Sequence, residues 1–414
     1  MMFRALRHGN FRFFFMGQTV SLVGTWMQIM AVSWLAYRLT NSPLLLGCVA
    51  FVAQIPSLFL APIAGVVADR YDRRKLLLWA QAFSMTQAVI LTVLVLTHTV
   101  TILHILWLSF FLGIVNAFEL TVRQSFLVEL VDDKADLANA IALNALMFNL
   151  SRLLGPALAG MLIVSFGEGI CFMINAGSYT AVIAGLWCIK IVPRVQDPSG
   201  INVGRELKAG WRYAYGFLPI RMLLLVITLF SVIGAAIHTL LPVFVKEVFH
   251  GGPRMFGSLL TVSGSGAILG TMYLARKKSI LGFVETIALS AAMLSIGLVI
   301  FATTTILWVA FAAAFLIGLA MMVGIGGGNM VLQTLVHEEK RGRVMSLYAV
   351  ALLGTAPIGS LSAGAFASKF SAGSALAAGS MVTLLGAILF WRKLKRFHLV
   401  ARSIYIDKGI IPEI

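Results

Sequence analysis

Long apolar runs dominate the chain and recur at short intervals. A helix of about 20 apolar residues crosses the roughly 30 Å hydrocarbon core of a bilayer. The pattern predicts twelve membrane-spanning helices, at residues 13–37, 44–68, 76–97, 102–125, 138–166, 170–192, 220–247, 254–275, 283–304, 306–334, 344–369 and 375–391. The first run is too long for a cleaved signal peptide, and no small-residue cleavage site follows it.

One gap between the runs, residues 193–219, is longer than the others and contains Pro, Gly and several charges. It lies near the middle of the chain and predicts a linker between two six-helix bundles. We therefore expect an N-terminal bundle at 1–192, a C-terminal bundle at 220–391 and a basic tail at 392–414.

Composition supports a membrane protein, because 59% of the residues are hydrophobic and only 12% are charged. Soluble domains average about 45–50% apolar and about 25% charged residues, so a water-soluble enzyme is excluded. The net charge of +16 would suggest nucleic acid in a soluble chain. Here the positive residues lie between apolar runs, and we expect no nucleic-acid partner. The three cysteines show neither a disulfide framework nor zinc-site spacing.

The basic residues lie mostly on one side of the predicted spans. That side, which includes both termini, holds 27 of the 32 Lys and Arg residues. The other side holds Arg38, Lys246, Arg254 and Lys369, and Arg152 lies within a span. The positive-inside rule places both termini in the cytoplasm. The tail from Arg392 to Lys408 is then expected to face anionic lipid.

The two halves of the chain repeat each other at a nearly constant offset. A shift of 210 places Ser21-x-x-Gly24 on Ser231-x-x-Gly234, and a shift of 205 places Gly113 on Gly318. A shift of 204 places the stretch from Gly155 to Gly160 on that from Gly359 to Gly364. This repeat predicts two pseudo-symmetric six-helix bundles that enclose a central cavity, open to one side at a time.

The loop between the second and third spans reads Gly65-Val-Val-Ala-Asp69-Arg70-Tyr-Asp72-Arg73-Arg74-Lys75. It resembles the G-x-x-x-D-R-x-x-R-R/K loop of the major facilitator superfamily, with Asp72 where that family often has Gly. Asp69 and Arg73 are four residues apart and can pair. The resemblance implies a conformational switch made of Gly65, Asp69, Arg70, Arg73, Arg74 and Glu129. The alternative is a loop that only follows the positive-inside rule.

Gly155, Pro156 and Gly160 lie inside the fifth span, where they resemble the antiporter motif of superfamily exporters. Proline removes a backbone donor and bends a helix, while glycine allows close helix contact. The alternative is ordinary membrane-helix packing, in which both residue types are common.

Several further phrases are similar to a bacterial branch that includes the enterobactin exporter and macrolide-efflux proteins. They are Phe3-Arg-Ala-Leu-Arg7, Gly24-Thr-Trp26-Met-Gln28, Val122-Arg123-Gln124-Ser125 and Leu137-Ala-Asn139. This resemblance implies export of amphipathic small molecules across the bacterial inner membrane, driven by proton entry.

Ionisable groups inside spans are costly and are therefore functional candidates. Glu119 and Arg123 share a face of the fourth span, and Arg152 lies near the middle of the fifth. We interpret Glu119 as the proton-coupling site, with Arg123 and Arg152 as competing partners. The alternative is a structural Glu–Arg pair that orients the two spans.

The candidates for the substrate cavity are polar or aromatic residues within spans: Gln28, Trp26, Trp34, Asn116, His238, Asn329 and Gln333. For each of them the alternative is packing or an interhelical hydrogen bond.

The sequence contains no nucleotide-binding P-loop and no catalytic constellation, so no catalytic residue, metal or cofactor is expected. The predicted function is secondary active transport, as proton-coupled efflux of a drug or siderophore by alternating access. Alternatives are an importer or lipid or solute facilitator on the same fold, a membrane enzyme, or a non-transporting membrane scaffold. The expected partners are the substrate, protons and the lipid bilayer, and the expected state is a monomer.

Overall fold

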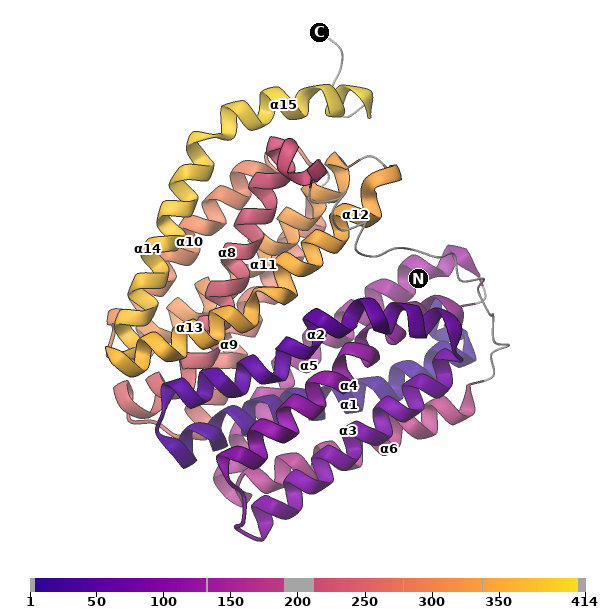
Figure 1. The fold of residues 1–414 in the computed structure, drawn as a ribbon, viewed down its shortest axis with the longest axis vertical. Coiled ribbons are helices and arrows are strands. Elements are labelled where there is room, and N and C mark those ends of the chain that lie inside the picture. Colours follow the sequence, from indigo (N-terminus) through magenta and orange to yellow (C-terminus); the bar gives the residue numbers. More distant parts are fainter. Residues whose placement is uncertain (1–3, 132, 190–211, 278, 337, 409–414) are drawn as a thin grey trace. The chain divides into compact units, whose positions relative to one another are not determined.

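The computed structural model describes residues 4–131, 133–189, 212–277, 279–336 and 338–408, and every regular element among them is helical (Figure 1). Twelve helices are long and apolar enough to cross a membrane, judged by length and composition. They coincide with the twelve predicted spans. Most of the expected linker, residues 193–211, and the last six residues of the tail lie outside the described residues.

The described residues form two compact units. Unit 1 takes Met1–Gly200 together with Leu241–Thr261, and unit 2 takes Ile201–Leu240 together with Val262–Ile414. The stretch that joins unit 1 from the second half of the chain runs from the end of α8 through the first turns of α9.

The first half of the chain contains α1 (Gly9–Thr40), α2 (Pro43–Arg70), α3 (Arg73–Leu96), α4 (Ile102–Leu127), α5 (Lys134–Phe166) and α6 (Glu168–Cys188), with short 3-10 turns η1 (Arg4–Arg7) and η2 (Val128–Leu130). The second half contains α8 (Leu218–Val243), η3 (Phe244–Val248), α9 (Pro253–Arg276), α10 (Phe283–Thr303), α11 (Leu307–Leu335), α12 (Glu338–Ala349), η4 (Val350–Gly354), α13 (Ala356–Lys369), α14 (Ala372–Arg392) and α15 (Leu394–Asp407).

Two spans depart from regular α-helix close to a proline. The predicted span 344–369 consists of α12, the π-helical η4 and α13, with Pro357 in the first turn of α13. Proline lacks the N–H that would continue the α-helical ladder, so the backbone before Pro357 shifts to a wider turn. A second π-helical turn, η3, follows Pro242 at the end of α8. In contrast, α5 stays helical through Pro156.

Close helix packing at glycine reproduces the internal repeat in three dimensions. A Cβ atom at Gly113 of α4 would lie 2.5 Å from the Ala53 carbonyl oxygen of α2. The corresponding atom at Gly318 of α11 would collide with the Ser263 carbonyl oxygen of α9. Ala53 and Ser263 are related by the same shift of 210 that the sequence predicts. Both halves therefore pack their second and fourth spans backbone to backbone.

A second pair of contacts follows the same rule. Gly155 of α5 approaches the Val23 carbonyl oxygen of α1, at 3.0 Å from the position of an added Cβ. Gly359 of α13 packs directly on the backbone of Val232 in α8. The first and fifth spans of each half thus meet in nearly the same register.

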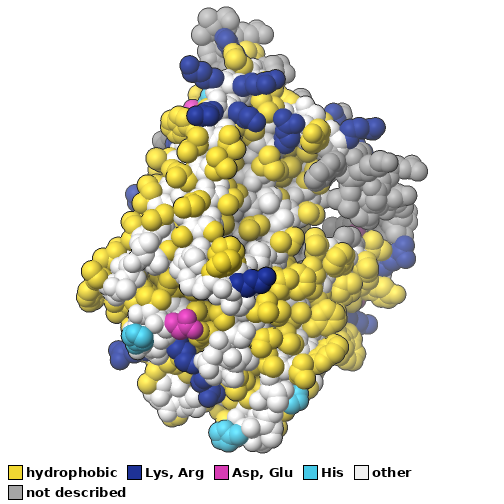
Figure 2. Space-filling model, turned by 60° about the vertical axis from the view of Figure 1, so that its left-hand side comes forward, with side chains coloured by type: hydrophobic (Ala, Val, Ile, Leu, Met, Phe, Trp, Pro, Cys, Tyr) yellow, Lys and Arg dark blue, Asp and Glu magenta, His cyan; other side chains and the backbone are white. Residues whose placement is uncertain are grey.

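The predicted basic tail forms an amphipathic helix, α15. Its apolar side is buried in unit 2, with Phe397 and Ala401 both 0% exposed, while His398 bonds to Glu285 of α10 at 2.7 Å. Burial, with the Glu285 carboxylate nearby, raises the pKa of Tyr405 to about 12. Hydrophobic side chains cover the face of unit 2 that carries α14, and Lys and Arg gather at the end where α15 lies (Figure 2).

Candidate functional site

The loop between α2 and α3 is short, and it ends in a helix cap. Asp72 is the N-cap of α3, and its carboxylate accepts hydrogen bonds from the backbone N–H groups of Arg74 (2.9 Å) and Lys75 (3.3 Å). This cap explains why Asp72 can stand where the family often has Gly. Asp is favoured at the N-cap position, and the backbone there has no positive φ that would require Gly. The cap fixes the direction in which Arg73 and Arg74 leave the helix.

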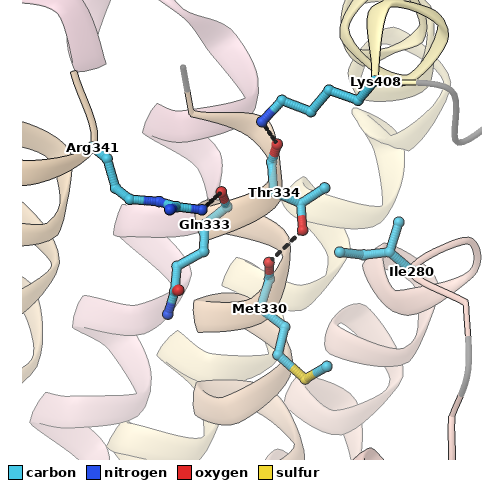
Figure 3. A pocket seen from close by; sticks show the side chains of 6 residues that line it. All are labelled: Ile280, Met330, Gln333, Thr334, Arg341 and Lys408. Atoms are coloured by element: carbon cyan, nitrogen blue, oxygen red, sulfur yellow. Dashed lines mark hydrogen bonds between the residues drawn. The ribbon is translucent and has the colours of Figure 1, made fainter. Parts of the chain in front are cut away.

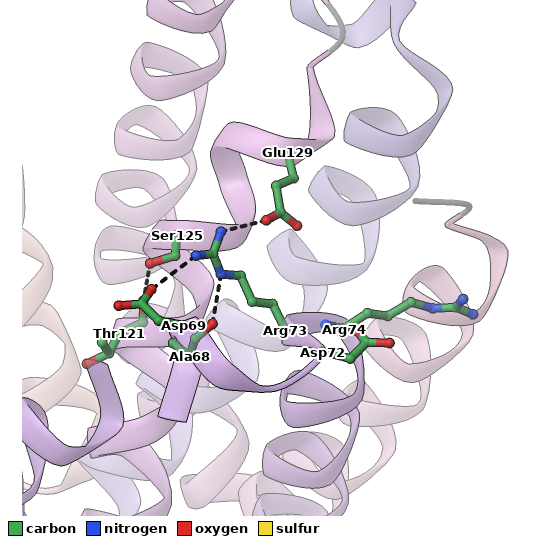
Figure 4. Close-up of polar contacts among 8 residues, drawn as sticks. All are labelled: Ala68, Asp69, Asp72, Arg73, Arg74, Thr121, Ser125 and Glu129. Carbon is green, nitrogen blue, oxygen red and sulfur yellow. Dashed lines mark hydrogen bonds and ion pairs between the residues drawn. The ribbon is translucent and has the colours of Figure 1, made fainter. Parts of the chain in front are cut away.

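Arg73 is the centre of the loop's ion pairs (Figure 4). Its guanidinium lies 2.5 Å from the Glu129 carboxylate of η2 and 3.3 Å from the Asp69 carboxylate of α2, and its Nε donates to the Ala68 carbonyl at 3.1 Å. Only 12% of the Arg73 side chain is exposed. We call Asp69, Arg73 and Glu129 the switch cluster. It joins the ends of α2, α3 and α4.

The other residues of the predicted switch are placed differently. Arg74 donates to the carbonyl oxygens of Leu186 (2.7 Å) and Trp187 (2.9 Å), at the C-terminal end of α6. Unpaired carbonyls at a helix end attract cations, so this contact ties α3 to α6. Arg70 is exposed and makes no ion pair or hydrogen bond within the described part of the chain. Gly65 has no neighbouring atom within 4 Å of an added Cβ.

An apolar layer lies beside the switch cluster and holds its helices together. Phe14, Val122, Phe126 and Leu130 are almost completely buried there, in one cluster with Ala68. Ion pairs next to such a layer are partly shielded from water, so removing one partner costs more than it does in an exposed pair. The switch cluster can therefore stabilise one arrangement of the helix ends and release it when Arg73 loses its partners.

Glu119 and Arg123 form an ion pair inside α4. Arg123 Nε lies 3.4 Å from Glu119 Oε1, and the two side chains are 11% and 15% exposed respectively. Asn116 is exposed one turn before Glu119 on the same face. Of the two arginines expected to compete for Glu119, Arg123 is the one in contact.

Gln28 belongs to a buried network of side-chain amides within unit 1. It donates to Gln87 of α3 at 2.9 Å and accepts from Asn175 of α6 at 2.8 Å, and Asn175 also donates to the Tyr179 hydroxyl at 3.3 Å. Gln28 is only 2% exposed. This geometry favours the interhelical alternative for Gln28, because both of its amide atoms are satisfied by protein.

The Gly-Pro face of α5 packs on two helices. Trp26 of α1 lies against Gly155, and its ring contacts Phe148 edge to face with centroids 5.7 Å apart. On the other side, an added Cβ at Gly160 would lie 2.9 Å from the Pro253 carbonyl oxygen at the start of α9. The motif thus gives α5 two close backbone contacts, which is the use that the sequence predicts for its glycines.

Two side chains from residues 241–261 form hydrogen bonds at the C-terminal end of α1, which is the end away from the basic loops. The Tyr37 hydroxyl donates to the Glu247 carboxylate, and Lys246 donates to the Asn41 side-chain carbonyl at 2.5 Å. We call Tyr37, Asn41, Lys246 and Glu247 the outer cluster. Beside it, the Trp34 and Phe256 rings stack with centroids 6.1 Å apart. Trp34 is 7% exposed and therefore packs as an interior side chain.

The remaining candidates lie in unit 2, and one of them, Gln333, lines a pocket. Gln333 donates to Asn329 one turn earlier on α11 at 3.0 Å, whereas His238 is exposed on α8. A pocket of about 450 Å³ lies at the end of α11 (Figure 3), lined by Ile280, Met330, Gln333, Thr334, Arg341 and Lys408. In the part of the chain that the structure describes, no three His, Cys, Asp or Glu side chains gather as metal ligands.

Comparison with known proteins identifies the family. Residues 2–402 match the family described as transmembrane secretion effector. The chain belongs to this family, within the major facilitator superfamily. The superfamily is the one that the sequence resemblance implies, and its members are transporters rather than enzymes. This chain is accordingly a multi-pass membrane transporter.

The relatives of this chain match most of its length. It is 28% identical to the staphyloferrin A transporter of Staphylococcus aureus, over 84% of this chain and 87% of the relative. It is 24% identical to macrolide efflux protein A of Streptococcus pyogenes, over 85% and 88%. A solved structure of a peptide transporter has the same fold, with a TM-score of 0.76 at 10% identity over 94% and 95% of the chains.

Lys408, which lies at the end of the predicted basic tail, contacts the end of α11. Its ammonium donates to the carbonyl oxygens of Thr334 (2.6 Å) and Val336 (3.1 Å), which end α11. Arg341 adds a longer contact to the Gln333 carbonyl at 3.5 Å. The spacing of Leu394, Phe397, Ala401 and Ile404 at helical intervals would have revealed α15. The carbonyl partners of Lys408 come from packing and leave no sequence signal.

We predict that Lys408→Ala releases α15. A charge-assisted hydrogen bond contributes about 1.5–3 kcal/mol, so local opening of the helix should become at least about tenfold more frequent. Limited trypsin digestion of the purified protein, followed at Arg396 and Arg402, measures this opening. Lys393→Ala, which removes an exposed charge just before the same helix, should leave the rate unchanged. Equal rates for both variants and the wild type would contradict a role for Lys408 in docking.

Proposed function

We propose that this transporter exports amphipathic small molecules, of drug or siderophore type, by proton-coupled alternating access. The relatives support the direction and the ligand class, since one is named a staphyloferrin A transporter and another a macrolide efflux protein. The multidrug efflux pump Tap of Mycolicibacterium fortuitum is also similar, at 22% identity over 92% of this chain.

The Glu119–Arg123 pair is the observation that carries proton coupling. A carboxylate inside a span is costly, and at 3.4 Å Arg123 offsets its charge while both side chains keep some access. Protonation of Glu119 removes that attraction and frees Arg123 to repack. A substrate or proton that changes this pairing shifts the balance between conformations by its differential affinity for them.

Two clusters at opposite ends of the spans supply the contacts that such a cycle needs. The switch cluster stabilises the end with the basic loops, and the outer cluster ties α1 to the segment after α8 at the other end. In the cycle that we propose, the outer cluster holds the exit closed while the cavity is open to the cytoplasm. Trp26, Asn116, His238, Asn329 and Gln333 remain the candidates for the cavity wall.

The proposed location is the bacterial cytoplasmic membrane, with both termini in the cytoplasm and the protein acting as a monomer. The positive-inside distribution of Lys and Arg supports this orientation.

The decisive experiment is substrate-elicited proton flux in proteoliposomes, with lipophilic cations, macrolides and siderophores as probes. We predict that Glu119→Gln lowers the flux at least about tenfold, because a neutral amide cannot exchange the proton. Glu168→Gln is the matched control. It removes a carboxylate that also pairs with an arginine, Arg38 at 2.8 Å, but lies at the start of α6 outside the proposed coupling site.

Retained flux in Glu119→Gln would remove Glu119 from the mechanism and leave a structural pair. Wild-type counterflow of substrate without any proton movement would mean a facilitator, or a different coupling ion, on the same fold.

A further inference from the structure

Arg152 lies near the middle of the membrane span Ala135–Phe166 of α5. It lies 17 residues after the start of this span and 14 residues before its end. An arginine at this depth is among the least favourable residues in a bilayer, unless another group compensates its charge.

No described residue provides that compensation. The guanidinium of Arg152 makes neither an ion pair nor a hydrogen bond with any residue that the structure describes, although it is only partly exposed. Glu119, which the sequence suggests as a partner for Arg152, is already paired with Arg123 at 3.4 Å. Glu119, Arg123 and Arg152 together therefore carry one positive charge that no described residue compensates.

The position of Arg152 on α5 places it toward the protein interior. At about 100° per residue, Gly155, which packs on α1, lies roughly 60° to one side of Arg152. Gly160, which packs on the start of α9, lies roughly 80° to the other side. The well-exposed side chains Leu154 and Met161, at 47% and 50%, lie on the opposite face. Arg152 thus occupies the face between the α1 contact and the α9 contact.

We propose that Arg152 binds an anionic group of the substrate, with a carboxylate or sulfonate as the chemical class. A planar guanidinium presents parallel N–H donors that match such oxygens in a bidentate pair. In this arrangement the ligand supplies the countercharge that no described residue provides, so binding is strengthened because the arginine's desolvation is offset. The assignment rests on the proposed function only in requiring that the chain binds a small-molecule substrate.

Two xanthene dyes of opposite charge test the assignment directly. Carboxyfluorescein, an anion, and rhodamine 6G, a cation, are titrated into the purified full-length protein in nonionic detergent, and binding is read by fluorescence anisotropy. Arg152→Gln is expected to weaken carboxyfluorescein binding at least tenfold and to leave rhodamine 6G binding unchanged or tighter. Arg152→Lys, which keeps the charge but loses the planar donors, should fall between the wild type and Arg152→Gln.

Lys369→Gln is the matched control, because it removes one positive charge at an exposed helix end and should leave both dyes unaffected. A second readout separates binding from a structural role. The ligand-free unfolding temperature of Arg152→Gln should rise by a few degrees, since an uncompensated charge is removed. A structural arginine would instead give a lower unfolding temperature.

Failure of carboxyfluorescein to bind the wild type, equal binding by Arg152→Gln, or a lower unfolding temperature of that variant would each overturn the assignment. Because anisotropy needs no gradient, absence of proton flux would count against the proposed function alone. Proton flux elicited by rhodamine 6G and retained in Arg152→Gln, with no anion binding, would count against the anion site alone.

Discussion

Replacing Arg73 by alanine is expected to lower substrate transport by one to two orders of magnitude. The guanidinium is the shared partner of Asp69 and Glu129, and its loss leaves the Glu129 carboxylate, which is only 20% exposed, without a countercharge. Removing one partner of a partly buried pair costs about 2–3 kcal/mol here, somewhat less than for a fully buried pair. A shift of that size in a two-state equilibrium changes the populations by roughly 30- to 150-fold.

The measurement is the initial rate of substrate efflux from energised membrane vesicles, normalised to the amount of protein. Arg70→Ala is the informative comparison, since it removes the same charge from the same loop but breaks no ion pair or hydrogen bond among the described residues. We expect less than about a twofold effect for it, as for other exposed charges. Equal losses in both variants would mean that the loop acts through its total charge and not through the switch cluster.

Replacing Gly318 by alanine is expected to destabilise the protein more than the same replacement at any other described glycine. The added Cβ would collide with the backbone carbonyl oxygen of Ser263 and lie 2.9 Å from the Ser263 hydroxyl oxygen. Backbone cannot rotate away as a side chain can, so α9 and α11 must separate along their contact. We expect a loss of about 3 kcal/mol and a fall in unfolding temperature of roughly 5–10 °C.

Tryptophan fluorescence during heating in detergent gives this value. Gly177→Ala is the control, because Gly177 lies within α6 with no atom within 4 Å of an added Cβ. In that variant the better helix propensity of alanine should leave stability unchanged or slightly higher. Gly113→Ala tests the repeat, and it should also destabilise, through the equivalent contact with Ala53. Tolerance of both Gly113→Ala and Gly318→Ala would show that the helix contacts are looser than described.

The sequence was sufficient for the fold because its two main signals are long-range and redundant. Twelve apolar runs predict the spans, and the glycine matches at shifts of 210, 205 and 204 predict two homologous six-helix bundles. The switch cluster was also accessible, since Asp69 and Arg73 are spaced by one helical turn and the motif marks their loop. Its third member, Glu129, is also named from the sequence, because it lies at the end of the fourth span, and the structure places its carboxylate 2.5 Å from Arg73.

The partners of the polar side chains within the spans could not be predicted from the sequence, for a physical reason. In a membrane helix, lipid-facing and protein-facing residues are both apolar, so periodicity does not say which way a polar side chain points. Gln28 illustrates this, because its partners Gln87 and Asn175 come from helices far away in the sequence. Arg152 is a second example. Spacing along the chain does not show that Glu119 pairs with Arg123, or that no described residue pairs with Arg152.

The docking of α15 affects how the protein can be labelled and shortened. Lys408 holds the end of α11 through its hydrogen bonds to the Thr334 and Val336 carbonyl oxygens. A bulky fluorescent reporter joined directly after Lys408 would strain these hydrogen bonds, and its brightness would report a population with a loosened tail. A chain cut after Arg392 would expose the apolar bed of Phe397 and Ala401 to the cell's quality-control proteases. Reporters are better joined through a long flexible spacer, and low abundance of a tail-deleted variant should be read as faster degradation before it is read as lost transport.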